Sequence, residues 1–525
     1  MTAPYRPLTL LAALVLTPLV VLGQDATPTP ESSEEVMRLS LDEAIDLALA
    51  NNIGLRIDGF DIDVQRFTYL GTWGAFDPIA SVTGSFTDAE QQAATSLAGA
   101  DVVESENIGL NAGLLFPLET GGSVNLGYDH NYNKTNSTFS VGESLDQAGF
   151  SVTYAQPLLR GAWTGYNTVL QHQAELRFLQ AEAGHAELEA NLRRDVTNAY
   201  WDVIAAREAL TVQEETLSLG EQQLAQNERR LQVGVGTEVE VLQAQTNVAT
   251  QREALLQART NLAAADDALK SMLFARRAGD DWAAWYAWWD QPIEPLTPLP
   301  EVTTVTAEWT ASLARALATR PELAQRRYDI ELAELELLKA TSEERAALDL
   351  ELALTSNAVN DKTAKAFETA AKYDYPTASA SLTFSTPLFN RTAENAYRAA
   401  RIGVRSARLG YEQVETQILA EVRAAVREAH YQAEAVRAAE ISFDLAQRQL
   451  AAEEARFAQG ISTNFQVLEF QQQLSQAKSS LVAARVGYAK SRTALLRAEG
   501  RLLEGALPEA NDAPPQDALP SDAPE

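Results

Sequence analysis

Cysteine is absent from the 525-residue sequence, and histidine occurs only four times. Without cysteine the chain can form no disulfide and no thiolate metal site, and it offers no cysteine for lipid attachment. The histidines, His130, His172, His185 and His430, are scattered without the spacing of metal ligands. We therefore expect neither a bound metal nor a cofactor.

Basic residues are also few compared with acidic ones. The chain has 42 Lys and Arg against 72 Asp and Glu, which gives a formal net charge of −30. Because nucleic-acid binding requires clustered Lys and Arg, we expect no nucleic-acid partner. A phosphate-binding loop and a G-x-S-x-G motif are missing as well, so the sequence predicts a protein that is not an enzyme.

Long hydrophobic runs are missing except at the N-terminus. Residues 1–23 have the pattern of a secretory signal: Arg6, an apolar core over residues 8–22, and small residues before Gln24. An uncleaved membrane anchor is the alternative, but the run is shorter than the ~18 residues that a spanning helix needs, and it contains Pro18. No later segment is apolar enough to span a membrane as a helix, so a membrane-crossing chain would need a β-barrel.

One stretch occurs twice, and the rest of the chain is arranged around it. Residues 230–242 read RLQVGVGTEVEVL and residues 456–468 read RFAQGISTNFQVL, each matched residue being 226 positions apart. Gly234 and Gly460 end a helix, because glycine enters the left-handed conformation without strain. Thr237 and Thr463 are N-caps, and Glu240 and Gln466 stand where a capping box closes. Each stretch is therefore predicted to be the tip of a helical hairpin.

The flanking segments repeat apolar residues every seventh position. This period is typical of coiled coils with a left-handed supercoil. At about 1.5 Å per residue, the helix that precedes the first tip would be about 105 Å long and the returning helix about 60 Å. The period is carried by Val196, Val203, Leu210, Leu217, Leu224, Leu231; Val241, Val248, Leu255, Leu262, Leu269; Val422, Ala429, Val436, Phe443, Leu450, Phe457; and Val467, Leu474, Leu481, Tyr488, Leu495.

Each hairpin follows a shorter helix and a group of strands. In the first half we expect a helix from Ser40 to about Gly71, strands near residues 79–86, 108–116, 124–130 and 150–156, and a polar loop over 88–104. In the second half we expect a helix over 311–345 and strands at 348–355 and 378–385 around another polar loop. The resulting division is 1–23 signal, 24–38 linker, 39–274 first repeat, 275–308 connector, 309–504 second repeat, and 505–525 disordered acidic tail.

The connector is rich in tryptophan and proline. Five aromatic residues occupy positions 282–289, and four prolines follow at 292–300. The simplest interpretation is a strap that packs its indoles on the outside of the helices. A sugar-binding platform or a membrane-interface belt remains the alternative, without a polar constellation to support it.

These features together resemble the TolC family of outer-membrane efflux channels. The resemblance spans Ser40 to Gly500 and is carried by the paired tips, by the segment QPLLRG at 156–161 and by the segment TRPEL at 319–323. It implies a mainly α-helical homotrimer. The duplicated long coiled-coil hairpins would form an α-barrel tunnel through the periplasm, and the strands would join a trimeric transmembrane β-barrel. It further implies a periplasmic adaptor protein and an inner-membrane transporter as partners, in an efflux or type I secretion system.

The resemblance also implies roles for residues at the tips. A pore constriction would involve Glu469, Gln466, Glu240 and Gln243, of which only Glu469 keeps a charge without a capping role. Adaptor docking would involve Arg230, Gly234, Thr237, Arg456, Gly460 and Thr463, although an arginine in the last turn of a helix also complements the helix dipole. The hairpin over 108–130 departs from the family pattern: it could add two membrane strands or fold back over the barrel mouth.

Two other classes of protein share parts of this pattern. A secreted or surface-anchored coiled-coil scaffold or adhesin would account for the heptads but not for strands in both halves. A periplasmic adaptor would account for one hairpin only. The outer membrane of a Gram-negative-type bacterium, with most of the chain in the periplasm, is therefore the expected location.

Overall fold

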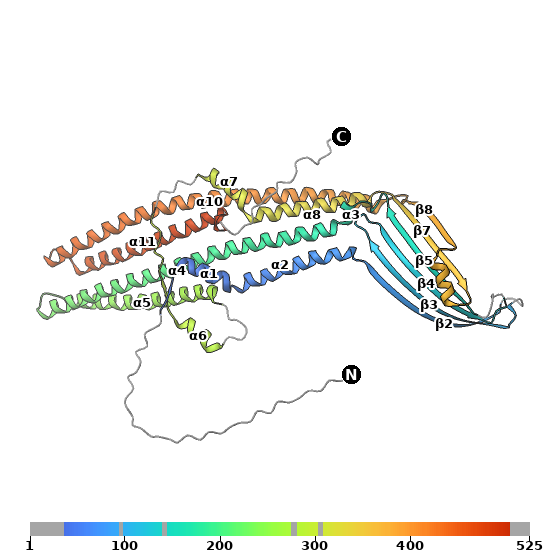
Figure 1. Cartoon of the computed structure of the whole chain (residues 1–525). Coiled ribbons are helices and arrows are strands. Elements are labelled where there is room, and N and C mark those ends of the chain that lie inside the picture. Colours follow the sequence, from blue (N-terminus) through green and yellow to red (C-terminus); the bar gives the residue numbers. More distant parts are fainter. Residues whose placement is uncertain (1–35, 94–97, 139–143, 275–280, 303–307, 504–525) are drawn as a thin grey trace, which may run out of the picture.

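The computed structural model describes residues 36–93, 98–138, 144–274, 281–302 and 308–503. The predicted signal segment, most of the linker and the acidic tail lie outside these ranges. Figure 1 shows an elongated molecule in which long helices run to one end and a sheet extends from the other. Across the described residues, no helix combines the length and the apolar character needed to cross a membrane.

Six antiparallel strands form one open sheet in the order β2-β3-β4-β5-β7-β8. Both halves of the chain contribute, and β2 and β8 form the two edges (Figure 1). The strands are longer than predicted, because residues 88–92, expected in a loop, pair with residues 102–106. The strands are β2 Ile79–Gln92, β3 Val102–Pro117, β4 Ser123–Thr135, β5 Ser144–Pro157, β7 Ala347–Asn360 and β8 Pro376–Ser385.

The hairpin whose position the sequence left open lies within this sheet. β3 pairs with β2 along its length, and β4 pairs with β5 from Ser123↔Ala155 to Lys134↔Ser144. The hairpin therefore extends the sheet and does not fold back over it. Its Thr120-Gly121-Gly122 turn is tied to the strand-to-helix segment, since Gln156 Nε2 donates to the Thr120 carbonyl at 2.9 Å.

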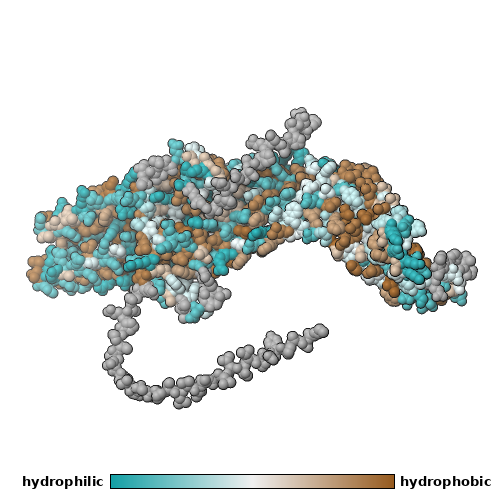
Figure 2. Space-filling view, viewed as in Figure 1, coloured by the Kyte–Doolittle hydropathy of each residue, from teal (hydrophilic) through white to brown (hydrophobic). Residues whose placement is uncertain are grey.

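The two faces of the sheet differ in polarity. The register of the strands places a row of apolar residues side by side across all six strands. The neighbouring residue of each strand, which faces the other side of the sheet, is small or polar. The first row is Ala80, Leu114, Leu126, Val152, Leu354 and Ala378; the second is Ser81, Gly113, Gly127, Ser151, Thr355 and Thr377. In Figure 2 hydrophobic residues gather over the part of the sheet nearest the helices.

A short helix, α9 Thr363–Ala371, replaces the polar loop predicted between β7 and β8. It packs on the apolar face, where its Ala366 and Ala370 are buried against Ala148 and Ala358. The helix has no side-chain N-cap bond. Its stability therefore depends on packing against β5 and β7, which the local sequence does not reveal.

The long helices form two hairpins that lie side by side (Figure 1). The first joins α4 Val169–Gln232 to α5 Glu238–Leu273, and the second joins α10 Arg391–Ala458 to α11 Asn464–Ala498. Most residues of the predicted seven-residue period are buried in these hairpins, among them Val196, Val248, Val422, Leu450 and Val467. The exception is the end of α4, where Leu231 is 39% exposed.

Each shorter helix of the prediction is broken in the structure. Residues 40–71 form α1 Leu41–Asn51 and α2 Ile53–Thr72, because Asn52 stops the first helix and its side chain caps the second at Leu55 N. Residues 309–343 form α7 Trp309–Thr319 and α8 Pro321–Glu343, with a proline in the first turn of α8. In Figure 1, α2 continues the line of α5 beside α4, as the helix lengths suggested.

Ion pairs hold the break between α7 and α8. The Arg320 side chain is 5% exposed and bonds to Glu421 at 2.6 Å and to Glu322 at 2.8 Å, while Arg497 also reaches Glu322 at 2.7 Å. Although burial opposes ionisation, the hydrogen bonds and charges of Arg320 and Arg497 outweigh it and lower the pKa of Glu322 to about 2. The segment TRPEL at 319–323 therefore contains an ion-paired break between α7 and α8, which we call the ionic joint.

The connector contains a helix and a strand. α6 Trp282–Asp290 carries the aromatic residues, and β6 Ile293–Pro295 pairs in parallel with β1 Met37–Leu39. Ile293 and Leu39 enter the largest buried cluster, together with Tyr200 and Val203 of α4. The connector is thus fastened to the middle of the first hairpin. Two further short helical segments, α3 Thr164–Asn167 and a 3-10 turn Trp73–Phe76, link the sheet to the long helices.

Candidate functional site

The two hairpin tips have the same backbone turn. Gly234 has φ +74° and Gly460 has φ +75°, the left-handed conformation predicted for both. One residue later, Val235 N donates to the Arg230 carbonyl and Ile461 N to the Arg456 carbonyl, each at 3.0 Å. These bonds satisfy carbonyls that the helix ends leave free, so each helix stops at the predicted residue.

The first tip closes with a full capping box. Glu240 N donates to the Thr237 side-chain oxygen at 3.3 Å, and Thr237 N donates to the Glu240 carboxylate at 3.0 Å. Gly236 is also part of this turn, because a Cβ there would stand 2.9 Å from Leu231 N. The predicted role of Glu240 as a cap is therefore confirmed.

The second tip closes differently, and the predicted second capping box is wrong in one half. Thr463 accepts from Gln466 N at 3.4 Å, as expected. The Gln466 side chain does not return to the cap; its Oε1 accepts from the Ser462 hydroxyl at 2.9 Å. The same hydroxyl, which has a single proton to donate, also lies within hydrogen-bond distance of the buried Glu453 carboxylate, so the two acceptors share it. The reason is that residue 462 is serine where the first tip has Gly236.

Buried polar side chains join the two hairpins just behind the tips. Asn464 begins α11 and is 1% exposed; its Oδ1 accepts from Gln223 Nε2 at 2.8 Å and from Asn227 Nδ2 at 2.9 Å, both on α4. The Asn464 Nδ2 atom is buried without a partner among the described residues. A half-satisfied buried network of this kind favours a specific pairing at some cost in stability.

Arg230 also contacts the other hairpin. Its guanidinium carbon lies 4.6 Å from the ring centroid of Phe457, a buried residue of α10. A cation over an aromatic face contributes about 0.5–2 kcal/mol. Arg456, the matching residue of the second tip, is exposed and lies 3.5 Å from Glu453. The two arginines therefore have different surroundings, and Arg456 is the more accessible one.

The residues predicted to narrow the pore lie on the surface of the chain. Glu469 and Gln243 are exposed, and the Glu469 carboxylate accepts a hydrogen bond from its neighbour on the same helix, Gln473, at 3.1 Å. Gln466 is exposed and Glu240 half-buried. The structure brings none of these four together within one chain, so a pore-lining role for them stays a prediction.

The sequence pattern missed the residues that connect the hairpins. Gln223 and Asn227 were passed over because the seven-residue period pointed to Leu224 and Leu231. The sequence does contain a signal for these residues: the two amides are four positions apart, so they lie on one face of the helix shortly before the tip. Which helix they face cannot be read from the sequence, since the partner, α11, is more than 200 residues away.

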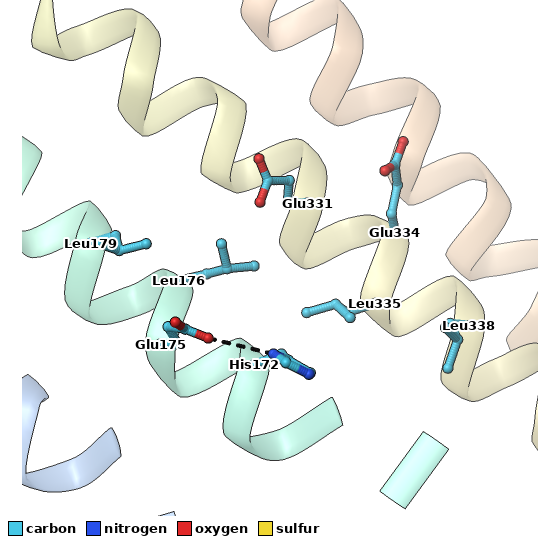
Figure 3. A pocket seen from close by; sticks show the side chains of 8 residues that line it. All are labelled: His172, Glu175, Leu176, Leu179, Glu331, Glu334, Leu335 and Leu338. Atoms are coloured by element: carbon cyan, nitrogen blue, oxygen red, sulfur yellow. Dashed lines mark hydrogen bonds and ion pairs between the residues drawn. The ribbon is translucent and has the colours of Figure 1, made fainter. Parts of the chain in front are cut away.

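A second candidate is a pocket of about 500 Å³ between α4 and α8 (Figure 3). Its floor is formed by leucines of both helices, and its rim carries His172 and Glu175 of α4 and Glu331 and Glu334 of α8. Burial and the neighbouring Glu334 raise the pKa of Glu331. Within the residues that the structure describes, no three His, Asp or Glu side chains are arranged to hold a metal ion.

Three of the four histidines have separate carboxylate partners. His172 Nδ1 lies 3.5 Å from Glu175, His185 Nδ1 lies 2.7 Å from Asp58, and His130 Nε2 lies 3.1 Å from Asp146. These pairs are spread over the sheet and the helices, so they form no common centre.

Comparison with known proteins gives the fold and the family. The outer membrane efflux protein family model matches residues 90–273 and 312–501. None of the curated proteins matches the chain significantly. Among solved structures, the outer-membrane channel OprN has 14% identity and a TM-score of 0.63, covering 88% of this chain and 89% of its own.

Two other channels are similar to the same extent. The outer membrane protein VceC of Vibrio cholerae has 15% identity and a TM-score of 0.62, covering 88% of this chain and 96% of its own. The CmeC outer membrane channel of Campylobacter jejuni has 16% identity and a TM-score of 0.61, covering 88% and 85%. Since the family model covers well over half of the sequence, the chain belongs to the outer membrane efflux protein family, which consists of channels and not of enzymes.

Proposed function

We propose that three copies of this chain form one continuous conduit, in which the sheets close into a barrel in the outer membrane and the helices form a tunnel through the periplasm. The observation that carries the proposal is the open sheet. Its edges, β2 and β8, lack a partner strand on one side in the described chain, and one of its faces is apolar. Unpaired backbone groups are not tolerated in lipid, so the sheet must be completed by other copies.

The side edges of the molecule support the same assembly. α2 contacts α4 on one side and exposes a stripe of large apolar residues on the other. At the opposite edge α10 exposes Ile402 and Leu409. An exposed apolar stripe of this length is typical of a protein interface. The α2 stripe consists of Ile53, Ile57, Phe60, Val64, Phe67 and Leu70, each more than half exposed.

Edge-to-edge assembly would extend both layers at once. β2 and α2 belong to one edge of the chain, and β8 and α10 to the other (Figure 1). A copy placed against each edge pairs strand with strand and helix with helix. Three copies of a six-stranded sheet give eighteen strands, within the range of outer-membrane barrels.

In this assembly the tips are the periplasmic entrance. Glu469, with Gln466, Glu240 and Gln243 near it, would line the constriction. Arg230, Gly234, Thr237, Arg456, Gly460 and Thr463 would form the surface that meets a periplasmic adaptor, which in turn connects the conduit to an inner-membrane transporter. The cargo would pass by diffusion, which agrees with the absence of a phosphate-binding loop motif from the sequence. This is the architecture of an efflux or type I secretion system.

The oligomeric state tests the proposal. The full chain, purified from outer membranes in mild detergent, should have the mass of a trimer by light scattering and should conduct ions in planar bilayers. Phe60→Glu and Phe67→Glu together should weaken the trimer, because they place charges in the α2 stripe. A monodisperse monomer that conducts no ions would refute the proposal.

A secreted scaffold or adhesin is no longer a competing function. Such a protein would explain the helical hairpins, but it gives no reason for the single sheet built from both halves of the chain.

A further inference from the structure

Helix α9 brings a concentration of lysine to the apolar face of the sheet. The chain contains eight lysines, and three of them, Lys362, Lys365 and Lys372, lie in this helix or at its two ends. The six strands beneath it contain one lysine, Lys134, and no arginine. Lys372 pairs with Glu368 at 2.5 Å, whereas Lys362 and Lys365 are exposed and have no ion-pair partner among the described residues. We call these two the free lysines of α9.

The helix runs along the strands and not across them. At its start, Thr363 donates to the Asp146 carboxylate at 2.9 Å, and just beyond its end Tyr373 lines a pocket together with Val152. Asp146 and Val152 both belong to β5, so the helix follows this strand for most of its length. Since the strand order is β4-β5-β7-β8, one flank of α9 faces β4 and the other faces the β8 edge.

Phe367 identifies the flank that faces β4. Its ring centroid lies 5.7 Å from that of Tyr128 on β4 and 5.4 Å from that of Phe150 on β5. At about 100° per residue, Lys365 stands about 200° around the helix from Phe367. Lys372, seven residues after Lys365, lies on nearly the same line. The lysines of α9 are therefore directed towards β8, an edge of the sheet.

The opposite edge of the sheet carries the opposite charge. Alternate residues of a strand face the same side, so Asp88 and Glu90 of β2 lie on the apolar face described above. Glu106 and Glu104 of β3 stand in register with them. Like charges directly opposite each other destabilise a pair of strands, and β4 offers only Lys134, opposite Glu106. Within the part of the chain that the structure describes, none of the four carboxylates has an ion-pair partner within 4 Å.

The two edges would meet with their helix-proximal ends together. β2 leaves the helices at Ile79 and β8 returns to them at Ser385, so a β8 edge placed against the β2 edge of another copy pairs with it in antiparallel fashion. With these ends aligned, Pro376 lies nine residues along β8 (385 − 376) and Asp88 nine residues along β2 (88 − 79). Asp88 of the next copy would then stand beside Pro376.

The middle of α9 lies at this level. Pro376 pairs with Ser356 of β7, and Ser356 pairs with Phe150, the ring that Phe367 contacts. Lys365 is two residues from Phe367, so it is level with the neighbour's acidic pair. Strands are about 4.8 Å apart, which puts the next copy's β2 about 12 Å from the axis of a helix that lies over β5 and β7. The radius of the helix and the two facing side chains together span this distance.

We propose that α9 is a clasp between copies of this chain, in which its free lysines form ion pairs with Asp88 and Glu90 on β2 of the next copy. This step rests on the proposed trimer and adds a specific contact to it. Net charge does not provide the attraction, because Asp361 and Asp374 flank the helix and offset its lysines. The flank on which the lysines stand provides it.

The membrane gives a reason for the pairing. In the proposed barrel the apolar face of the sheet points towards lipid, where unpaired charges are destabilising. Each copy would bring cations at one edge and carboxylates at the other, so three identical contacts would close the ring without an unmatched partner. These contacts lie at the seams between copies, where no turn connects the adjoining strands.

The experiment measures the trimer of the full chain by light scattering across a dilution series in mild detergent. Lys362→Glu with Lys365→Glu should raise the protein concentration at which half of the chain is trimeric about tenfold, because like charges then face each other. Asp88→Lys with Glu90→Lys should have the same effect, although it relieves the repulsion between β2 and β3 within one chain. All four changes together should return that concentration to within about threefold of wild type.

Ala364→Glu is the control on the same helix. Ala364 is exposed and lies two residues before the buried Ala366, so its side chain points away from the sheet. The variant adds a carboxylate to α9 without directing it at the β8 edge. The trimer should therefore form within about twofold of the wild-type concentration.

A second measurement locates the contact directly. Because the chain has no cysteine, Lys365→Cys with Asp88→Cys introduces the only two thiols. A short bis-maleimide should join them into covalent dimers and trimers, and neither single variant should give these products. A bis-maleimide is preferred to oxidation, because a disulfide would require Cα atoms within about 7 Å.

The outcomes separate the clasp from the proposed function. A stable wild-type trimer that ignores both charge reversals, that is not restored by combining them, or that yields no cross-link would overturn the clasp and leave the trimer standing. An equal loss in Ala364→Glu would also overturn it, since α9 would then respond to its total charge, as expected of a helix lying on phosphate headgroups. A monomeric wild type would overturn the clasp and the proposed function together.

Discussion

The two tips have the same turn, yet different side chains hold them in place. At the first tip Glu240 closes its own cap, and the residue that begins α5, Glu238, is exposed. At the second tip the matching residue is Asn464, buried against Gln223 and Asn227 of the first hairpin. The cap residue of the first tip is therefore held within its own turn, whereas the residue that begins α11 at the second tip bonds to the other hairpin.

The breaks in the shorter helices repeat this contrast. Asn52 separates α1 from α2 with a neutral cap. Arg320 separates α7 from α8 with ion pairs to Glu322 and Glu421. The break in the first half is therefore stabilised by a neutral cap, whereas the break in the second half is stabilised by ion pairs.

The largest change in the free energy of unfolding is expected at the ionic joint between α7 and α8. The depressed pKa of Glu322 stabilises the fold at pH values above about 4.5, and this contribution is lost as the pH falls from 4.5 towards 2. The shift from 4.5 to about 2 corresponds to about 3 kcal/mol. Glu322→Gln should therefore lower the free energy of unfolding by about that amount at pH 7, as measured by denaturant titration followed by circular dichroism.

The matched variant in the first half is Asn52→Ser. It keeps an oxygen at the cap, so its free energy of unfolding should fall by less than about 0.5 kcal/mol, without dependence on pH. If Glu322→Gln and wild type differ equally at pH 7 and pH 3, the ion pairs do not supply the stability assigned to them.

The next effect is expected behind the tips. Asn464→Ala removes the buried acceptor that Gln223 and Asn227 share and leaves each amide with one other acceptor, Asn227 Oδ1 and Glu240 O respectively; the two lost bonds should cost about 2 kcal/mol. Glu238→Ala, the matched change at the first tip, alters an exposed residue and should cost less than about 0.5 kcal/mol. Hydrogen exchange of the α11 amides would measure the local difference. Equal protection in the two variants would contradict the linked second tip.

A smaller and equal effect is expected at the turns themselves. A Cβ at Gly234 or Gly460 would meet no atom within 4 Å, so only backbone strain opposes a side chain there. Valine at φ near +75° should cost about 1–3 kcal/mol at either tip, whereas asparagine tolerates that conformation and should cost less. Thermal unfolding of the four single variants would show whether both turns respond alike, as their shared geometry requires.

The turns at the tips could be predicted from the sequence, whereas the contacts that surround them could not. The glycine that ends each helix and the threonine that caps the next act within a few residues, so the sequence is enough to place both turns. The heptads likewise identified the helix pairs. Gln223 and Asn227 were missed because their burial depends on α11, a partner that no local pattern specifies.

The same limit explains the errors in the sheet. Residues 88–92 are polar on both faces, yet they extend β2 because β3 offers backbone partners in register. Helix α9 forms where a loop was expected because Ala366 and Ala370 fit against small residues of β5 and β7. The first feature depends on backbone pairing with the next strand and the second on packing against β5, more than 200 residues away, and such tertiary contacts outweigh local propensity.

The smallest effect on stability, and a specific one on conduction, is expected at Glu469. Its carboxylate is exposed and its matched residue at the first tip is Gln243, so an assembly of three copies would carry one ring of three charges. Such a ring favours cations and binds multivalent ones. Glu469→Gln is nearly isosteric, so it should leave the trimer intact while it lowers cation selectivity and block by multivalent cations in planar bilayers. Gln243→Glu should do the reverse, since it adds a second ring at the other tip. If neither variant changes selectivity or block, both side chains lie on the outer surface of the tunnel and the constriction is formed by other residues.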